Sequence, residues 1–272
     1  MRICLPCINH DFSRPTIEGG TVWLSNLRDA LIQKGHDAVL VRLDQACDGD
    51  VMIIQSEWTK KIAYTTFSGR KIVLLGHFIG GNYPDPKQIE ADQFVTTWKG
   101  ALIDGFKADF VPHGYNDSFR PKQGSGVIWA GNTYALRDEH WLKGIEPTEV
   151  TGVLPKDLPY QGAVCPNIYG DFQLGKVSTD DSRIADKPGF MINERFWQVI
   201  GSGGILIDMY NPQVFDFFEE DEIIFAKTKE EFQKKILYYK DHVQEGIDFY
   251  ERARNKVRLY HTYKKRIKLF NL

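Results

Sequence analysis

The sequence predicts an α/β protein in which short parallel strands alternate with amphipathic helices. Apolar runs of strand length, such as residues 51–55 and 71–75, alternate with segments whose apolar residues recur at helical spacing. Residues 112–126 interrupt this alternation with clustered proline, glycine and charge, which is typical of a linker. The alternation then restarts. We therefore predict two doubly wound domains, each built on a parallel sheet.

The N-terminal domain is predicted at residues 1–118 and begins with a strand at 3–8. A helix at 22–34 has one apolar face and ends at Gly35, a typical C-cap. Further strands are predicted at 38–43, 51–55, 71–75, 94–98 and 110–111, with a helix at 60–67. The loops after the first and fourth strands lie at the carboxyl edge of such a sheet, where doubly wound folds bind their ligands.

The second domain is predicted at residues 119–250, and residues 251–272 as a basic C-terminal helix. Its strands are expected at 127–130, 150–153, 174–177, 205–208 and 223–225, and its helices at 136–143, 193–202 and 229–239. The proline-rich residues 155–166 predict an irregular crossing. A long basic helix is expected from residue 248 onward.

Composition narrows the class of protein. A net charge of −2 does not indicate nucleic acid or an acidic membrane as a partner. No signal peptide is recognisable and no apolar run approaches the ~20 residues that cross a bilayer. We therefore expect a cytoplasmic protein without a membrane span, as a monomer or weak oligomer. Cys4 and Cys7 form a C-x-x-C on the first strand, without the features of a redox or zinc pair, so we expect core-filling thiols in a reducing compartment.

Residues 191–212 are the most informative stretch, because an amphipathic helix is joined there to a buried strand. Arg195 and Gln198 are three residues apart on the helix and can reach one ligand together. Gly203 and Gly204 supply a left-handed turn and allow backbone to approach a ligand closely. An ordinary αβ unit with a surface arginine explains the same pattern.

Several motifs in the C-terminal half extend this stretch. They read NERFWQ at 193–198, SGGILID at 202–208, FF at 217–218, EEF at 230–232 and HTYKKR at 261–266. Together they resemble glycosyltransferases of the GT-B fold, and especially the branch that includes the CgeB-type spore proteins and many phage enzymes, with its N-x-R-x-F-E and H-T-Y motifs. The resemblance covers residues 189–266 well and the N-terminal half only loosely.

This resemblance implies a GT-B architecture, with two Rossmann-like domains, a cleft between them and a C-terminal helix packing back. It also implies a hexosyl- or pentosyltransferase that uses a nucleotide-diphosphate sugar, most often a UDP-sugar, as co-substrate, without a bound metal or other cofactor. The donor would lie on the C-terminal domain and the acceptor on the N-terminal one. The implied donor-binding residues are Arg137, Asn193, Arg195, Gln198, Gly203 and Gly204, with Gly19 and Gly20 at the first helix.

Gln198 departs from the family pattern, which usually has a glutamate that accepts hydrogen bonds from the donor ribose. Glutamine keeps an acceptor oxygen and adds an amide donor, so it can still bind a ribose. It lacks the charge-assisted strength of a carboxylate, which leaves the type of donor open.

Sugar transfer calls for two kinds of catalytic group. The leaving diphosphate gains negative charge, which Arg137, Arg195 and a helix N-terminus can stabilise without metal. If a protein base activates the acceptor, we expect it on the N-terminal domain. The candidates for this base are His77, Glu18 and Asp11. Each has a structural alternative, such as a helix cap for Glu18, and an enzyme that retains the anomeric configuration can lack a dedicated base.

The basic C-terminal segment, with its interleaved tyrosines, could grip a phosphate backbone or form a solvated surface. A hydroxylated pyrimidine in phage DNA is therefore one predicted acceptor, which would place the protein in the host cytoplasm. A saccharide, a protein or a lipid-linked acceptor is the alternative. A non-catalytic nucleotide-sugar-binding protein is a second class. No G-x-G-x-x-G follows the first strand, which disfavours a dinucleotide oxidoreductase.

Overall fold

The computed structural model describes residues 1–8, 19–75, 86–99, 108–130, 141–142, 144–151, 159–169 and 191–272. They divide into two compact units. The N-terminal unit holds the described residues of Met1–His113, Asp171–Met191 and Tyr263–Leu272, and the C-terminal unit those of Gly114–Gly170 and Ile192–Thr262. The assignment of an acceptor-side domain to residues 1–118 and a donor-side domain to 119–250 stays a prediction, because a division by contacts does not test function.

A six-stranded parallel sheet forms the centre of the N-terminal unit, with strand order β2-β1-β3-β4-β5-β6. The strands are β1 Arg2–Cys7, β2 Asp37–Arg42, β3 Val51–Gln55, β4 Arg70–Leu75, β5 Gln93–Thr96 and β6 Asp109–Phe110. Chain order reverses between β1 and β3, which is the doubly wound arrangement. Both faces of such a sheet are buried, and for this reason its strands appear in the sequence as continuous apolar runs.

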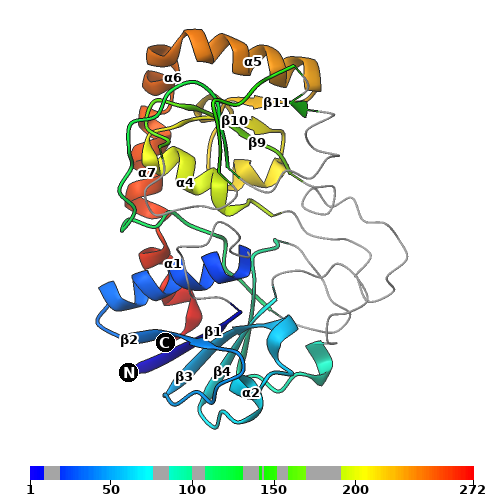
Figure 1. The fold of residues 1–272 in the computed structure, drawn as a ribbon, viewed down its shortest axis with the longest axis vertical. Coiled ribbons are helices and arrows are strands. Elements are labelled where there is room, and N and C mark those ends of the chain that lie inside the picture. Colours follow the sequence, from blue (N-terminus) through cyan, green and yellow to red (C-terminus); the bar gives the residue numbers. More distant parts are fainter. Residues whose placement is uncertain are drawn as a thin grey trace. The chain divides into compact units, whose positions relative to one another are not determined.

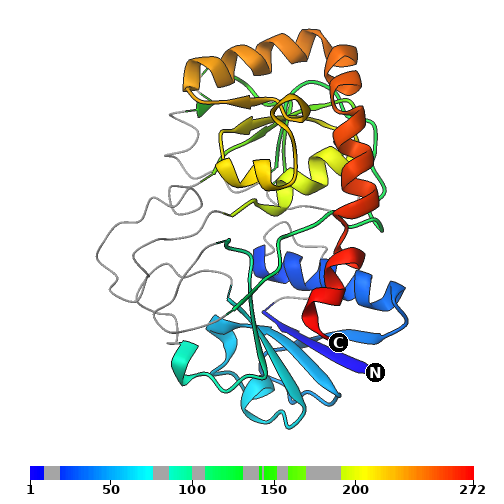
Figure 2. The ribbon, with the colours of Figure 1, turned by 180° about the vertical axis from the view of Figure 1, so that it is seen from behind.

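Helices and the end of the chain cover this sheet (Figure 1). The helical segments are α1 Gly19–Gln33, η1 Ser56–Trp58, α2 Ile62–Thr65, η2 Pro86–Gln88, α8 Tyr263–Arg266 and η6 Ile267–Phe270. Gly35 ends α1 with φ of +86°, as predicted from its C-cap position. Tyr263, Ile267 and Phe270 are buried in the core of the unit, and α8 lies beside α1 (Figure 2).

Two helix predictions need correction. The helix expected at 60–67 is only the four-residue α2, and a separate 3₁₀ turn, η1, precedes it. The long basic helix expected after residue 248 is broken into α6 Val243–Phe249, α7 Glu251–Tyr260 and α8. Between α7 and α8 the backbone N–H of Tyr115 donates to the carbonyl of His261 at 2.8 Å, and Tyr115 forms a bridge with Thr262. These contacts replace the helical hydrogen bonds at that point.

The C-terminal unit contains a three-stranded parallel sheet in the order β11-β10-β9, together with the paired strands β7 and β8. The strands are β7 Ile128–Ala130, β8 Glu149–Thr151, β9 Val164–Asn167, β10 Ile205–Met209 and β11 Phe225–Ala226. The helical segments are α4 Glu194–Ser202, η4 Pro212–Asp216, η5 Glu220–Glu222, α5 Lys229–Asp241, α6 and α7. Helices α4 and α7 lie side by side (Figure 1).

An irregular crossing was predicted at residues 155–166. The prediction is wrong for residues 164–166, which belong to strand β9. Pro166 is the third residue of β9 and stands opposite Ile207 of β10. The N–H of Val164 donates to the carbonyl of Gly126, on the side away from β10. Alternate residues of a strand direct their N–H groups to the same neighbour, so the nitrogen of Pro166 also faces away from β10 and the missing donor leaves the β9–β10 ladder intact.

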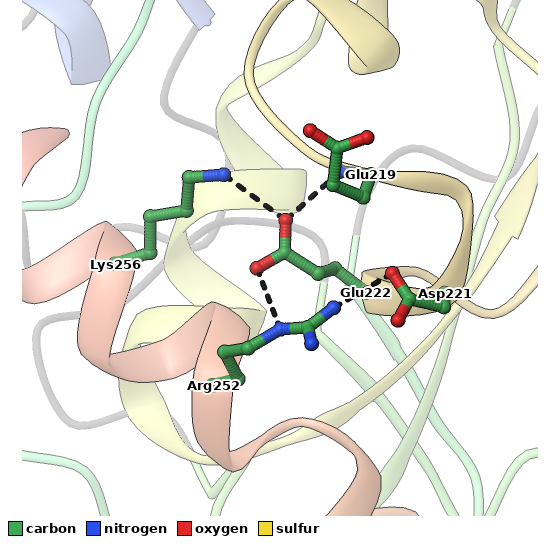
Figure 3. A network of polar contacts seen from close by, with 5 residues as sticks. All are labelled: Glu219, Asp221, Glu222, Arg252 and Lys256. Carbon is green, nitrogen blue, oxygen red and sulfur yellow. Dashed lines mark hydrogen bonds and ion pairs between the residues drawn. The ribbon is translucent and has the colours of Figure 1, made fainter.

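Helix α7 is attached to the unit by a buried carboxylate (Figure 3). Glu222 is 4% exposed, and its two oxygens accept from Arg252 Nε and Lys256 Nζ, each at 3.0 Å. The backbone N–H of Glu219 donates to the same carboxylate at 2.8 Å, and Arg252 also reaches Asp221. This network accounts for part of the basic character of the C-terminal segment, since Arg252 and Lys256 pair with Asp221 and Glu222 of η5.

Cys4 and Cys47 are joined as a disulfide, so the prediction that Cys4 is a free core-filling thiol is wrong. Cys7 and Cys165 are buried thiols, as expected of core-filling cysteines, and burial raises the pKa of Cys7 to about 11. Among the described residues no helix is long and apolar enough to cross a membrane.

Candidate functional site

Polar side chains gather in the C-terminal unit where β9 and β10 end and α4 begins. We call this set the polar cluster; its members are Asn167, Tyr169, Asn193, Arg195 and Asp208. Asn167 is the last residue of β9 and stands in register with Asp208 of β10. Because parallel strands bring their carboxyl ends to one edge, two residues far apart in the chain become neighbours there.

Asn193 begins α4 and orients its first turn. It has extended backbone angles, and its Oδ1 accepts from the backbone N–H of Phe196 at 3.1 Å, as an N-cap residue does. Its Nδ2 donates to Oδ1 of Asn167 at 2.9 Å. The buried face of α4, with Phe196, Val199 and Ile200, packs into the core of the unit at the spacing that predicted it. The start of α4 is therefore fixed to the end of β9.

Arg195 lies in the first turn of α4 and contacts two strands of the unit, β9 and β7. Its NH1 donates to Oδ1 of Asn167 at 3.3 Å. Its guanidinium carbon lies 4.5 Å from the ring centre of Trp129 in β7, which is a cation–π contact. The arginine is thus not an isolated surface cation, as the alternative interpretation of the sequence held, but a partly buried member of the cluster.

Asp208 is the acid of the cluster and is 1% exposed. Its carboxylate accepts from Nδ2 of Asn167 at 2.8 Å and from the hydroxyl of Tyr169 at 3.3 Å. Burial raises the pKa of Asp208 well above its usual range, although these hydrogen bonds and the charge of Arg195 act in the opposite direction. Burial also raises the pKa of Tyr169, with the nearby Asp208 charge adding to the effect.

The start of α4 therefore has the features of an anion-binding site. The first N–H groups of a helix carry partial positive charge and point outward along its axis. Arg195 adds a planar guanidinium within the same turn, which suits phosphate oxygens. Within the part of the chain that the structure describes, no group of three or more His, Cys, Asp or Glu side chains could hold a metal ion.

Gln198, predicted to contact the donor ribose, has a different setting. Its side chain is fully buried, with Nε2 donating to the carbonyl of Gly114 at 3.0 Å and Oε1 accepting from the N–H of Asn116 at 3.3 Å. The amide thus joins α4 to residues 114–116 of the same unit. A glutamine provides both a donor and an acceptor for this purpose, whereas an ionised glutamate has only acceptors.

Gly203 and Gly204 lie at the opposite end of α4 from Arg195. Gly203 ends the helix with φ of +89°. A β-carbon at Gly204 would lie 2.8 Å from Cγ1 of Val199 and 3.0 Å from the carbonyl oxygen of Tyr160. The helix has nine residues, so its ends are about 13 Å apart. Among the described contacts these glycines serve helix termination and close packing, and their predicted approach to a nucleotide stays a prediction.

Several predicted site residues lie outside the described residues: the candidate bases His77, Glu18 and Asp11, and the candidate diphosphate contact Arg137. Gly19 and Gly20 are the first two residues of α1. The structure thus brings together Asn193 and Arg195 from the predicted set.

Sequence reasoning missed Asn167 and Tyr169, and it used Asp208 only as the end of a strand and of the motif at 202–208, without a role in the site. The available signal was positional, because polar residues at the carboxyl ends of adjacent parallel strands meet at one edge. The proline before Asn167 concealed the strand that carries it.

Comparison with solved structures establishes the fold class. The chain is similar to sucrose-phosphate synthase from Thermosynechococcus elongatus, with a TM-score of 0.61 and 10% identity over 99% of this chain and 97% of that one. It is similar to T4 phage BGT in complex with UDP and Mn²⁺, with a TM-score of 0.60 and 12% identity over the whole of both chains. An α1,3-fucosyltransferase gives a TM-score of 0.51 and 12% identity over 99% of this chain and 88% of that one. The chain therefore has the GT-B fold, as predicted.

The sequence itself adds one match. Residues 165–271 match a family described as glycosyl transferase-like, and this range begins within β9 and includes the whole polar cluster. No curated protein matches the chain.

Proposed function

We propose that this chain is a glycosyltransferase that moves a sugar from a nucleotide-diphosphate sugar to an acceptor hydroxyl. The observation that carries the proposal is the position of Arg195 and the N-terminus of α4 at the carboxyl edge of a GT-B sheet. Two findings support it: the glycosyl transferase-like match spans these residues, and one similar structure, the T4 phage BGT, was solved in complex with UDP.

In the proposed reaction the bond between the anomeric carbon of the sugar and the diphosphate oxygen breaks as the acceptor oxygen bonds to that carbon. The diphosphate leaves with the electron pair of the broken bond, so its negative charge increases. Arg195 and the first N–H groups of α4 stabilise this charge, with Arg137 as a further proposed contact and without a protein-bound metal. The proton of the acceptor passes to a base, for which His77, Glu18 and Asp11 stay the proposed candidates, or to the leaving group.

The proposed donor is a UDP-sugar, and the proposed acceptor is a hydroxylated pyrimidine in DNA. The DNA proposal is supported by similarity to a structure described as the DNA-modifying enzyme β-glucosyltransferase, with a TM-score of 0.56 and 11% identity. That similarity concerns the fold, so saccharide, protein and lipid-linked acceptors are kept as alternatives in the test.

The test is release of UDP from UDP-sugars by the purified chain, with UDP-glucose first. We expect slow hydrolysis alone and faster release with the correct acceptor, tested as hydroxymethylated DNA, unmodified DNA and oligosaccharides. Activity should persist with EDTA and fall with Arg195→Ala. Tight UDP binding without turnover on any acceptor would instead indicate a nucleotide-sugar-binding protein. Absence of both binding and turnover with all common nucleotide sugars would contradict the proposal.

A further inference from the structure

A chain of hydrogen bonds determines which way each amide in the polar cluster faces. Oδ1 of Asn193 accepts from the N–H of Phe196 as the helix cap, so its Nδ2 must face Asn167. Oδ1 of Asn167 therefore accepts from Asn193, and it also accepts from NH1 of Arg195 at 3.3 Å. Asn167 must then direct its own Nδ2 to the other side.

Asp208 supplies the acceptor that this orientation requires. Nδ2 of Asn167 donates to Oδ1 of Asp208 at 2.8 Å, between side chains that are 0% and 1% exposed. If the Asn167 amide turned over, its NH₂ group would face the donors of Asn193 and Arg195, and its oxygen would face an oxygen of Asp208. Several buried hydrogen bonds would be lost at once. The acid thus supports the amide orientation that the Asn193 cap and Arg195 require.

We propose that Asp208 is a positioning residue of the donor site, which holds Arg195 in place through the amide of Asn167. This inference rests on the proposed function, because it gives Arg195 the role of binding the donor diphosphate. Asp208 itself lies behind Asn167 and touches neither the arginine nor the donor in this account. Its part is to keep a neutral oxygen, rather than an NH₂ group, directed at the guanidinium.

The test compares two near-isosteric replacements. In Asp208→Asn the new amide can still accept from Asn167 and donate to the oxygen of Tyr169, so we expect the Kd for UDP to stay within about threefold of wild type. In Asp208→Leu the acceptor is gone, and we expect UDP to bind at least about tenfold more weakly, as for loss of one hydrogen bond to a charged group. Calorimetric titration at one pH and salt concentration measures both.

A second variant covers the case in which Asp208→Leu does not fold. Asn167→Ser keeps Asp208 but removes the amide that reaches Arg195, so we expect a similar loss of UDP affinity. If the two residues act in series, the double variant binds UDP no more weakly than the weaker single variant. Tyr250→Phe is the matched stability control: it removes a buried hydroxyl that donates to Leu206 of β10 and should lower stability without changing the Kd.

A direct measurement separates this inference from the proposed function. The side-chain Nε–Hε signal of Arg195, assigned by its loss in Arg195→Lys, reports the order of the guanidinium by NMR relaxation without any ligand. We expect this order to be kept in Asp208→Asn and lost in Asp208→Leu and Asn167→Ser. An unchanged signal in all three would overturn the inference, as would equal loss in Asp208→Asn and Asp208→Leu, which would indicate a role for the charge itself. If order changes as expected but wild type binds no nucleoside diphosphate, the proposed function fails and the positioning stands.

Discussion

Two carboxylates of the C-terminal unit are buried almost equally, yet their surroundings differ. Asp208 is 1% exposed and Glu222 is 4% exposed. Glu222 bonds two cations directly, Arg252 and Lys256. Asp208 bonds an amide and a phenol, and Arg195 donates to the far side of that amide.

The pKa shifts of the two acids follow from these partners. Burial raises the pKa of Asp208, and its neutral donors do not reverse the shift. Burial also acts to raise the pKa of Glu222, but the N–H of Glu219 and the two cations outweigh it and bring the pKa below its usual value. A buried acid that bonds cations directly attaches one element to another. A buried acid that bonds neutral groups keeps a polar site ordered at some expense of stability.

The largest expected effect is on UDP affinity, which should depend on the polar cluster around Asp208 and not on the network around Glu222. Arg195→Ala should weaken UDP binding by about 100-fold, because it removes a charge-assisted contact to a diphosphate. Isothermal titration of the two proteins measures this ratio. Lys240→Ala, which removes an exposed cation of α5, is the matched control and should leave the Kd unchanged. Equal Kd values for wild type and Arg195→Ala would show that the polar cluster takes no part in donor binding.

The second prediction concerns stability. Glu222→Gln removes the charge between Arg252 and Lys256, and we expect the free energy of unfolding to fall by about 1–3 kcal/mol, at the lower end because both cations are partly exposed. Urea denaturation measures the change. The Kd for UDP should not change in the folded variant. A large loss of UDP affinity here would mean that the two networks are not separate in function.

The third prediction uses pH to separate the two acids. Asp208 has a raised pKa in the folded chain, so wild-type stability decreases as pH rises above its unfolded value of about 3.8. Asp208→Asn should therefore gain stability relative to wild type from about pH 4 upward. Glu222 has a lowered folded pKa, so its stabilisation is present above about pH 4.5 and is lost as pH falls through the folded value.

The stability cost of Glu222→Gln should accordingly shrink below about pH 4.5, while that of Asp208→Asn changes in the opposite sense. Urea denaturation of wild type and both variants between pH 3.5 and 8 compares the slopes. Parallel profiles for the two variants would contradict the distinction between the acids.

The smallest expected effect lies at the far end of α4. Gly203→Ala places a side chain at φ of +89° and should destabilise the protein by about 1 kcal/mol, while the nearest atom to the new β-carbon, Nε of Arg254, lies at 3.5 Å. Thermal unfolding measures the loss. UDP affinity should be retained, because this end of the helix is far from Arg195. A strong loss of UDP affinity would indicate that Gly203 contributes to donor binding, as the sequence predicted.

The sequence predicted the αβ unit around α4 well, because its determinants are local. The apolar face of α4, the cap at Asn193 and the left-handed Gly203 all act within a few residues of one another. Arg195 could be selected for the same reason, since its helical spacing and the motif at 193–198 are local. Element type and position for this part of the chain followed from periodicity.

The partners of these residues could not be predicted in the same way. Asn167 and Asp208 are 41 residues apart and meet only because β9 and β10 pair in one register. Gln198 bonds backbone 82 and 84 residues earlier in the chain, which local patterns do not reveal. Pro166 also argued against the strand that carries Asn167, because the sequence does not show which side of a strand its nitrogen faces.

The central claim is that the start of α4 binds the diphosphate of a nucleotide donor. Titration of UDP and of uridine into wild type and Arg195→Ala tests it most directly, because only UDP carries the diphosphate. We expect wild type to bind UDP much more tightly than uridine, and Arg195→Ala to lose most of this difference while its affinity for uridine stays the same. A difference between UDP and uridine that is equal in both proteins would contradict the claim.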